Sequence, residues 1–492
     1  MRKDRSFTFK QFEIKSNIDG KTVDLRGSGN PVIEYRESIF MPYVEISAYI
    51  IDTGNTFPAD DGTDAGVGLL DAGFGQGTET IKFKLADEKG HVIDLSKDSD
   101  LRVASIKGDY QAFKNQSFLM TIVSKEAFDN TLLKNRVGGG EEKTDIKYSG
   151  KISSIARSII KENLKSPKAQ SMNVDETLNE YNGFGQDRTP FEMILDLQKL
   201  AIPNVQTSKG KSAKGNTAGY LFFQTSLGYQ FRSLDKLFDL TYKTVPRYIE
   251  NSRADEGVPI GYDGKILWSN ISQSVDALSQ FENGAWASKI YVFNDVTKKA
   301  DIKTLQSDGK GNGITAGRHL PKINKDYLDS DGKPLPTQKQ IVRQAVGQTV
   351  KGFDSIEKQV EKTDQINYNN EEIILQAHQN YRQKMNTSVE IIIEADLSLN
   401  AGDLIYCEFP ELSTKVTTVG SRTRKSGIYM IADLCHYGDV GNSFTGLHLV
   451  RDAYGAKPEQ TQQVQALADD SGYTLADATI IAGGGFVETV IE

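Results

Sequence analysis

The chain has 492 residues, with 58 basic and 66 acidic side chains and a formal net charge of −8 at pH 7. At roughly 100–200 residues per domain, this length predicts about three or four domains. The acidic balance argues against a general nucleic-acid-binding protein, which needs a basic surface to bind phosphates. No apolar run approaches the ~20 residues that a membrane-spanning helix requires. The charged start, MRKDRSFTFKQF, lacks the apolar core of a secretion signal, and Cys407 and Cys435 are the only cysteines. We therefore expect a mixed α/β protein that is made in a reducing cytoplasm and has no disulfide scaffold.

The part of the chain before residue 124 shows the period-two alternation of half-buried strands. Ile81, Phe83 and Leu85, for example, alternate with Lys82 and Lys84. Strands are predicted at Val44–Ile51, Ile81–Leu85, Val92–Leu95 and Ser117–Val123, with a hairpin turn at Asp87–Gly90 and a long Gly- and Asp-rich loop at Asp52–Gly77.

Helical periodicity replaces this alternation further along. Lys151–Leu164 places apolar residues on one helical face. A second helix is predicted from Thr189, because Thr189 and Glu192 form a capping-box pair around Pro190. Thr207–Gly215 is predicted to be a flexible basic loop.

Two aromatic strands flank a tight turn at Ser226–Gly228. Alternation puts Tyr220 and Phe222 on one face of their strand, and Tyr229 and Phe231 on one face of theirs, where we expect them to pack rather than bind a ligand. The later segments are predicted as a loop at Thr297–Lys333, helices at Gln338–Val360 and Asn370–Met385, and strands at Ser388–Glu394, Asp403–Phe409, Gly427–Leu434 and Thr445–Val450.

No pattern predicts catalysis or a cofactor. The glycine clusters do not match a phosphate-binding loop, and the five histidines show no metal-binding spacing. Asp329–Gly332 is predicted to be a turn rather than a calcium loop, because carboxylates are missing at the required positions. Asp60, Asp61 and Asp64 could gather a cation, but acidic surface loops usually stay solvated. We therefore expect no enzyme, no cofactor and no metal.

An ordered set of blocks resembles the baseplate hub proteins of contractile-tailed bacteriophages. The aromatic hairpin that ends in Arg232-Ser233-Leu234 is the most specific of them. The blocks are Thr121–Lys125, Tyr148–Ile160, Thr189–Leu195, Ala218–Leu237, Leu399–Pro410, Ser426–His436 and Thr445–Gly455. The chain departs from the family pattern in the loop at Asp52–Gly77, in the insertion around Thr297–Lys333 and in the C-terminal tail.

The resemblance implies an α+β, mainly β fold with two antiparallel β-barrel tube domains, each interrupted by a helix-containing insert. It implies a homotrimer whose six tube domains form a pseudo-hexameric ring. Such a ring adapts a hexameric tail tube to a trimeric central spike and leaves a channel through which DNA passes. Mapped onto this chain, the first tube domain is 1–123 with 216–245, and its helical insert is 124–215. The second tube domain is 246–296 with 386–455, and its outer helical insert is 297–385. The C-terminal extension is 456–492.

The expected partners are therefore further copies of the chain, a tail tube protein, a spike protein and other baseplate proteins. The expected location is the virion tail, after assembly in the host cytoplasm and without stable membrane insertion. Two alternatives stay open: a tail-associated peptidoglycan hydrolase, and the hub of a phage-like contractile injection system.

The C-terminal tail combines glutamines and a glycine run with an apolar end. Phe486, Val487, Val490 and Ile491 are candidate partner-binding residues, since strand addition to a partner's edge is one use for such an end. The competing interpretation is a frayed terminus.

Overall fold

The fold was analysed in a computed structural model of the chain, and it is α+β and mainly β. None of the helices in the parts that the structure describes is long and apolar enough to span a bilayer. The structure describes residues 7–27, 31–54, 57–58, 66–97, 99–112, 115–133, 136–137, 144–185, 187–204, 218–238, 245–250, 257–259, 261–273, 276–294, 299–307, 322–337, 340–345, 370–385, 387–410, 425–439 and 442–451.

The first β unit is built from the N-terminal strands, and their predicted alternation is confirmed. In β7, Ile81, Phe83 and Leu85 are buried while Lys82 and Lys84 are half-buried. The strands are β1 (Thr8–Lys15), β2 (Thr22–Asp24), β3 (Val32–Ser38), β4 (Glu45–Asp52), β5 (Phe57–Pro58), β6 (Gly66–Val67), β7 (Thr80–Ala86), β8 (Val92–Leu95), β9 (Leu101–Ala112) and β10 (Asn115–Ser124), with a 3-10 turn at Leu25–Gly27.

The second β unit is a closed six-stranded barrel in the order β25-β24-β18-β19-β23-β26, closed by the pairing of β25 with β26. Its strands are β18 (Arg247–Ile249), β19 (Gly264–Gln273), β23 (Thr387–Glu394), β24 (Leu404–Glu408), β25 (Gly427–Gly438) and β26 (Ser443–Arg451). The four strands predicted after residue 386 are confirmed in place.

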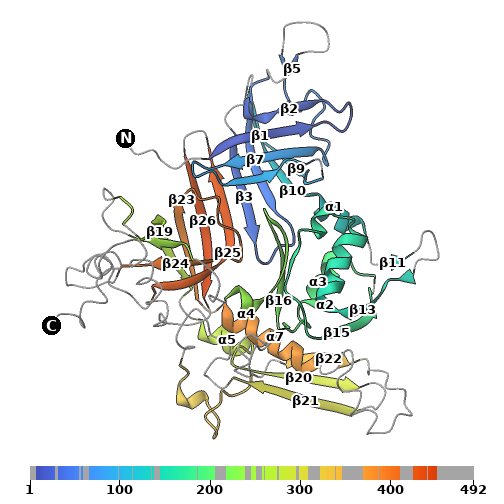
Figure 1. The fold of residues 1–492 in the computed structure, drawn as a ribbon, viewed down its shortest axis with the longest axis vertical. Coiled ribbons are helices and arrows are strands. Elements are labelled where there is room, and N and C mark those ends of the chain that lie inside the picture. The colour runs from blue at the N-terminus through green and yellow to red at the C-terminus, as the bar shows by residue number, and fades with distance from the viewer. Residues whose placement is uncertain are drawn as a thin grey trace, which may run out of the picture.

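The two β units share one sheet, because β3 of the first pairs antiparallel with β25 of the second. The sheet has 14 strands in total, since β5 and β6 form a separate two-stranded sheet, and β23, β26, β25 and β3 lie side by side in it (Figure 1). The hydrophobic core is also continuous, since Phe12 and Phe83 of the first unit belong to the same cluster as Ile391 and Leu449 of the second. The two units are therefore held together by backbone hydrogen bonds as well as by apolar burial.

A helical region follows β10 and has a core of its own. The capping box is confirmed at α3, where the Glu192 N–H donates to Thr189 Oγ1 and the Thr189 N–H to Glu192 Oε2. The predicted helix at Lys151–Leu164 forms as α2 (Ile152–Ser158) continued by a π-helical turn (Ile159–Asn163). The other elements are α1 (Lys125–Leu132), β11 (Arg136–Val137), β12 (Thr144–Asp145), β13 (Lys147–Lys151), a 3-10 turn (Pro167–Ala169), β14 (Asn173–Val174), β15 (Glu180–Phe184) and α3 (Pro190–Leu197).

The aromatic hairpin consists of β16 (Tyr220–Thr225) and β17 (Gly228–Ser233), pairs with β14 and leads into α4 (Leu234–Leu237). One face carries Tyr220, Phe222, Tyr229 and Phe231, which pack in the core of the helical region. Leu221 and Phe223, on the other face, pack in a cluster with barrel residues. The four aromatic rings are at most 1% exposed, so the predicted packing role is confirmed.

The segment between β19 and β23 differs from the prediction. It forms a small sheet in the order β21-β20-β22, covered by the last helix, α7 (Figure 1). Lys299–Gln306, predicted as loop, is strand β21, and Gln340–Ala345, predicted as helix, is strand β22. The apolar pair Ile341-Val342 fits the period of a helix as well as that of a strand, and parallel pairing with β20 stabilises the strand.

Residues 346–360 of the predicted helix and the loop Thr207–Gly215 lie outside the described residues. The elements are α5 (Ala277–Glu282), β20 (Ala287–Asn294), β21, a 3-10 turn (Lys325–Tyr327), β22 and α7 (Asn370–Lys384), which confirms the other predicted helix.

Candidate functional surface

One exposed sheet face extends across both β units. It lies on eight successive strands in the order β9-β10-β4-β3-β25-β26-β23-β19, which includes the junction of the two units. Residues that lie opposite each other in antiparallel strands point to the same side of the sheet. The register therefore gives the rows of this face directly, and the opposite face is buried in the shared core.

A central row shows how the face crosses the junction. Ile392 lies opposite Gly446, Gly446 opposite Cys435, Cys435 opposite Arg36, and Arg36 opposite Glu45. The row thus runs through β23, β26, β25, β3 and β4 without a break. The exposed sheet face includes Glu34, Arg36, Glu45, Ser47, Thr121, Glu390, Ile392, Glu394, Asp433, Cys435, Tyr437, Phe444, Gly446 and His448, all half-buried or exposed.

Charge on the exposed sheet face is mixed, with a slight excess of carboxylates. Its carboxylates are Glu34, Glu45, Glu390, Glu394 and Asp433. Its basic side chains are Arg36 and His448, together with Arg102 and Lys107 of β9, which lie opposite Val123 and Leu119 of β10. Arg36 is paired with Glu34, and His448 is paired with Asp433 through Nδ1 and Oδ2 at 2.8 Å. The hydrogen bond to Asp433 raises the pKa of His448 above its ordinary value, against the effect of burial. The face consequently presents more negative than positive charge.

The two outer strands of this surface each have an edge without a neighbouring strand. Among the described residues, β7 pairs with β9 only at Arg102 and Leu101, and β18 pairs with β19 only at Gly264 and Lys265. Val103 of β9 also exchanges backbone hydrogen bonds with Thr78 and Glu79. Beyond Val103, β9 is paired with β10 alone, and the remainder of β19 is paired with β23 alone. Unpaired edges of this length are sites at which another strand can add.

A buried carboxylate links the two units and the aromatic hairpin through hydrogen bonds. Glu37 of β3 accepts hydrogen bonds from the Tyr35 hydroxyl at 2.7 Å, from the Ser226 N–H of the hairpin turn at 2.6 Å and from the Ala401 N–H before β24 at 2.9 Å. Burial raises the pKa of Glu37 to about 7, against the lowering effect of these hydrogen bonds. The side chain therefore joins three segments that are far apart in the sequence.

The residues singled out from the sequence have different outcomes. Phe486, Val487, Val490 and Ile491 lie outside the described residues, as do Asp60, Asp61 and Asp64. The exposed sheet face was not identified from the sequence. Alternation marks the outward residues of each strand, but it carries no information on which strands are neighbours.

Comparison with known proteins finds likeness in structure alone. No family model matches the chain, and no curated protein matches its sequence. A 43 kDa tail protein of prophage MuSo2 from Shewanella oneidensis has a TM-score of 0.45 at 11% identity, covering 91% of this chain and 100% of that chain. A tail protein from Neisseria meningitidis has a TM-score of 0.46 at 8% identity, covering 91% of this chain and 97% of that chain.

A component of the E. coli type VI secretion system has a TM-score of 0.40 at 6% identity, covering 92% of this chain and 79% of that chain. It is described as structurally similar to tail proteins of bacteriophage T4. The three structures named here are thus described as two tail proteins and a secretion-system component.

Proposed function

We propose that this chain is the central hub of a contractile-tail baseplate, a structural protein without enzymatic activity. In this proposal three copies form a pseudo-hexameric ring that adapts a hexameric tail tube to a trimeric spike. The ordered sequence blocks that resemble hub proteins motivate the proposal. The observation that carries it is the exposed sheet face, which one chain builds continuously from two β units.

The two unpaired edges support the proposed ring. In a heterologous contact, the β9 edge of one copy would meet the β19 edge of the next. Such contacts generate a closed ring when the rotations that relate successive copies add up to one full turn. Each copy brings two β units, so three copies present six, which is the number that a hexameric tube requires. Edge pairing between copies also removes exposed edges that would otherwise promote uncontrolled aggregation.

The excess of carboxylates on the exposed sheet face suits the wall of a channel for DNA. Each phosphate neutralised by Lys or Arg adds salt-dependent affinity, which would hold the genome during transit. Arg36 and His448, on the central strands of this face, are already paired with carboxylates and therefore add little such affinity. The proposed partners are accordingly the tail tube, the spike and other baseplate proteins, with DNA only passing through and with the virion tail as the location.

Negative-stain electron microscopy of the purified full chain, alone and with its tail tube protein, tests this proposal. We expect rings with threefold symmetry and a central opening. A monomer at micromolar concentration that assembles with neither tube nor spike would contradict the proposal. Clearing of a peptidoglycan zymogram by the purified chain would instead support the hydrolase alternative.

A further inference from the structure

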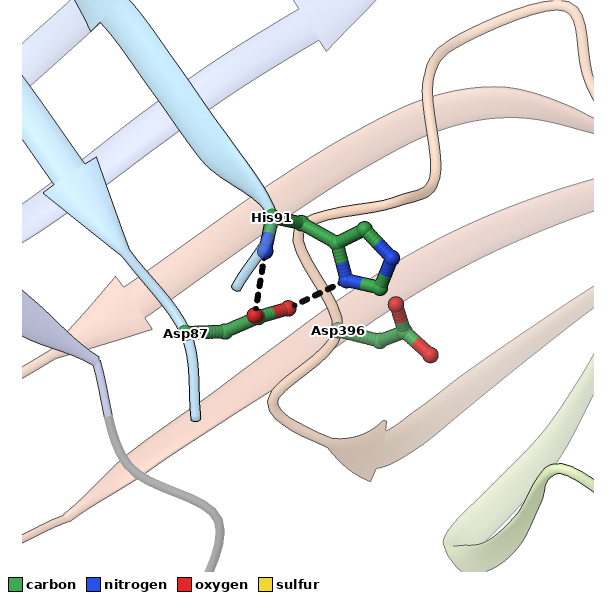
Figure 2. Close-up of side chains that lie close together, drawn as sticks. All are labelled: Asp87, His91 and Asp396. Atoms are coloured by element: carbon green, nitrogen blue, oxygen red, sulfur yellow. Dashed lines mark hydrogen bonds and ion pairs between the residues drawn. The ribbon is translucent and has the colours of Figure 1, made fainter. Parts of the chain in front are cut away.

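A cluster of three ionisable side chains lies where the first β unit contacts the barrel, and it is not part of the exposed sheet face. The turn between β7 and β8 carries Asp87 and His91, and the loop after β23 carries Asp396 (Figure 2). His91 Nδ1 lies 2.8 Å from Asp87 Oδ2, and the carboxylate of Asp396 lies beside the same imidazole ring (Figure 2). One potential ligand atom from each of the three residues lies within 4.8 Å of the other two.

The two carboxylates are almost completely removed from solvent. The side chains of Asp87 and Asp396 are each 3% exposed, whereas His91 is 42% exposed. Two buried negative charges this close together require compensating positive charge. Lys89 supplies one charge, with Nζ 3.3 Å from Asp396 Oδ2, and its side chain is 36% exposed and long enough to turn into solvent. A cation therefore already contacts one of the two carboxylates.

Outer hydrogen bonds hold both carboxylates in place. The Leu397 N–H donates to Asp87 Oδ2 at 3.3 Å, and the Tyr248 hydroxyl donates to Asp396 Oδ2 at 3.1 Å. Ser398 donates to Asp396 Oδ1 from its N–H at 3.1 Å and from its hydroxyl at 2.5 Å. Burial acts to raise the pKa of Asp396, but the Ser398 hydrogen bond and the charge of Lys89 hold it below its ordinary value. Carboxylates held by outer hydrogen bonds in this way are typical of protein metal sites.

We propose that Asp87, His91 and Asp396 bind a divalent transition-metal ion of the Zn²⁺ type. In the bound form Lys89 leaves Asp396, and the metal links the β7–β8 turn to the barrel. Two carboxylates neutralise the +2 charge, and an imidazole with carboxylate oxygens is a donor set for Zn²⁺ rather than for Ca²⁺ or Mg²⁺, which take oxygen ligands. Because the His91 side chain is 42% exposed, water can reach the site as a fourth ligand. This inference is independent of the proposed hub function.

The site could not be recognised in the sequence because its ligands come from opposite ends of the chain. The hydrogen bond from Leu397 to Asp87 spans 310 positions, and Asp396 immediately precedes Leu397. Metal motifs are recognised from ligands a few residues apart. The expectation that the chain binds no metal rested on such spacings alone.

Isothermal titration of the metal-free full chain with Zn²⁺, supported by elemental analysis, tests the proposal. We expect one equivalent to bind and to raise the melting temperature. Loss of a residue that hydrogen-bonds a metal ligand typically weakens metal binding roughly 10–100-fold. Tyr248→Phe removes such a residue and is expected to weaken Zn²⁺ binding by an amount within that range. His91→Ala removes a ligand itself and is expected to weaken Zn²⁺ binding by more. Lys89→Met is expected to tighten binding, because it removes the competing ammonium.

His448→Ala is the matched control, since His448 Nδ1 also lies 2.8 Å from an aspartate oxygen, that of Asp433. Among the described residues, however, His448 belongs to no group of three potential ligands. The control should bind Zn²⁺ like the parent. The proposal would be overturned if the parent does not bind Zn²⁺ at micromolar concentration, or if it prefers Ca²⁺ or Mg²⁺. It would also be overturned if His91→Ala binds Zn²⁺ as tightly as the parent, or if Lys89→Met binds it more weakly. Circular dichroism of His91→Ala establishes that a loss of binding is not a loss of fold.

Discussion

The Ala401 N–H donates a 2.9 Å hydrogen bond to the buried Glu37 Oε2 across 364 positions of sequence. This contact joins β3 of the first unit to the segment that enters β24 of the barrel. Because the Ser226 N–H donates to the other carboxylate oxygen, the ionisation of one side chain affects the packing of three segments.

The first prediction concerns the pH dependence of stability. Burial raises the pKa of Glu37 from 4.5 to about 7, so the folded state binds the proton more tightly than the unfolded state. The resulting stabilisation is fully present below about pH 4.5 and is lost as the pH rises through about 7. The shift corresponds to at most about 3 kcal/mol.

Urea denaturation of the parent and of Glu37→Gln across this pH range tests the prediction. The free energy of unfolding should decline less with rising pH in the variant than in the parent. Glu390→Gln, on the exposed sheet face, is the control, and equal slopes in the parent and Glu37→Gln would contradict the assignment.

The second prediction concerns the aromatic hairpin. Phe231 is fully buried, and its ring centroid lies 4.8 Å from that of Tyr220. Phe231→Ala should lower the free energy of unfolding by ~3–5 kcal/mol, because it leaves a cavity in the core of the helical region. The control is Phe184→Ala, whose ring is 55% exposed and whose loss should have little effect. If Phe231→Ala melts like the parent but no longer binds a partner, the hairpin is an interface and not a core.

The third prediction concerns Gly427, at the start of β25. Its φ is +145°, and a Cβ atom there would lie 2.9 Å from Arg451 Nη2, whose guanidinium stacks over the Tyr429 ring. Gly427→Ala should therefore destabilise the barrel by ~1–3 kcal/mol, since it combines backbone strain with displacement of Arg451. Gly108→Ala is the matched control, because nothing lies within 4 Å of a Cβ at that position. Equal melting temperatures for the two variants would show that the Arg451 side chain can move aside without a loss of stability.

The fourth prediction tests the exposed sheet face as a channel wall. The parent should not bind duplex DNA tightly at moderate salt. Exchange of Glu45, Glu390 and Glu394 for lysine should create binding that weakens as salt rises, because lysines on this face would neutralise phosphates. Gel-shift titrations at two salt concentrations measure the effect. The same number of lysine substitutions at Glu13, Asp24 and Asp94, which lie elsewhere on the first unit, provides the control. Tight duplex binding by the parent would refute the channel assignment.

The fifth prediction concerns the C-terminal tail, which we propose to be a docking arm ending in Phe486, Val487, Val490 and Ile491. Deletion of Ala482–Glu492 should leave the fold and any ring intact, while weakening attachment of the spike or of a neighbouring hub subunit. Co-purification with baseplate partners measures this. Retention of every partner after the deletion would indicate a frayed terminus.

Local patterns in the sequence determined the elements whose stability depends on near neighbours. The capping box of Thr189 and Glu192 and the alternation of Ile81, Phe83 and Leu85 each involve residues within one element, and both form as predicted. The resemblance of ordered blocks to hub proteins likewise led to the expectation of a mainly β fold. The capping box and the alternation follow from chain geometry at short range, whereas the expected fold rested on the resemblance.

The tertiary structure alone decided the features that depend on distant partners. Ile341-Val342 fits a helix or a strand, and parallel pairing with β20 selects the strand. The pairing of β3 with β25 creates the exposed sheet face, and the approach of Asp396 to His91 creates the candidate metal site. In each case the deciding energy comes from hydrogen bonds or charges between segments that are distant in the sequence, and a local sequence pattern contains no information on which segments meet.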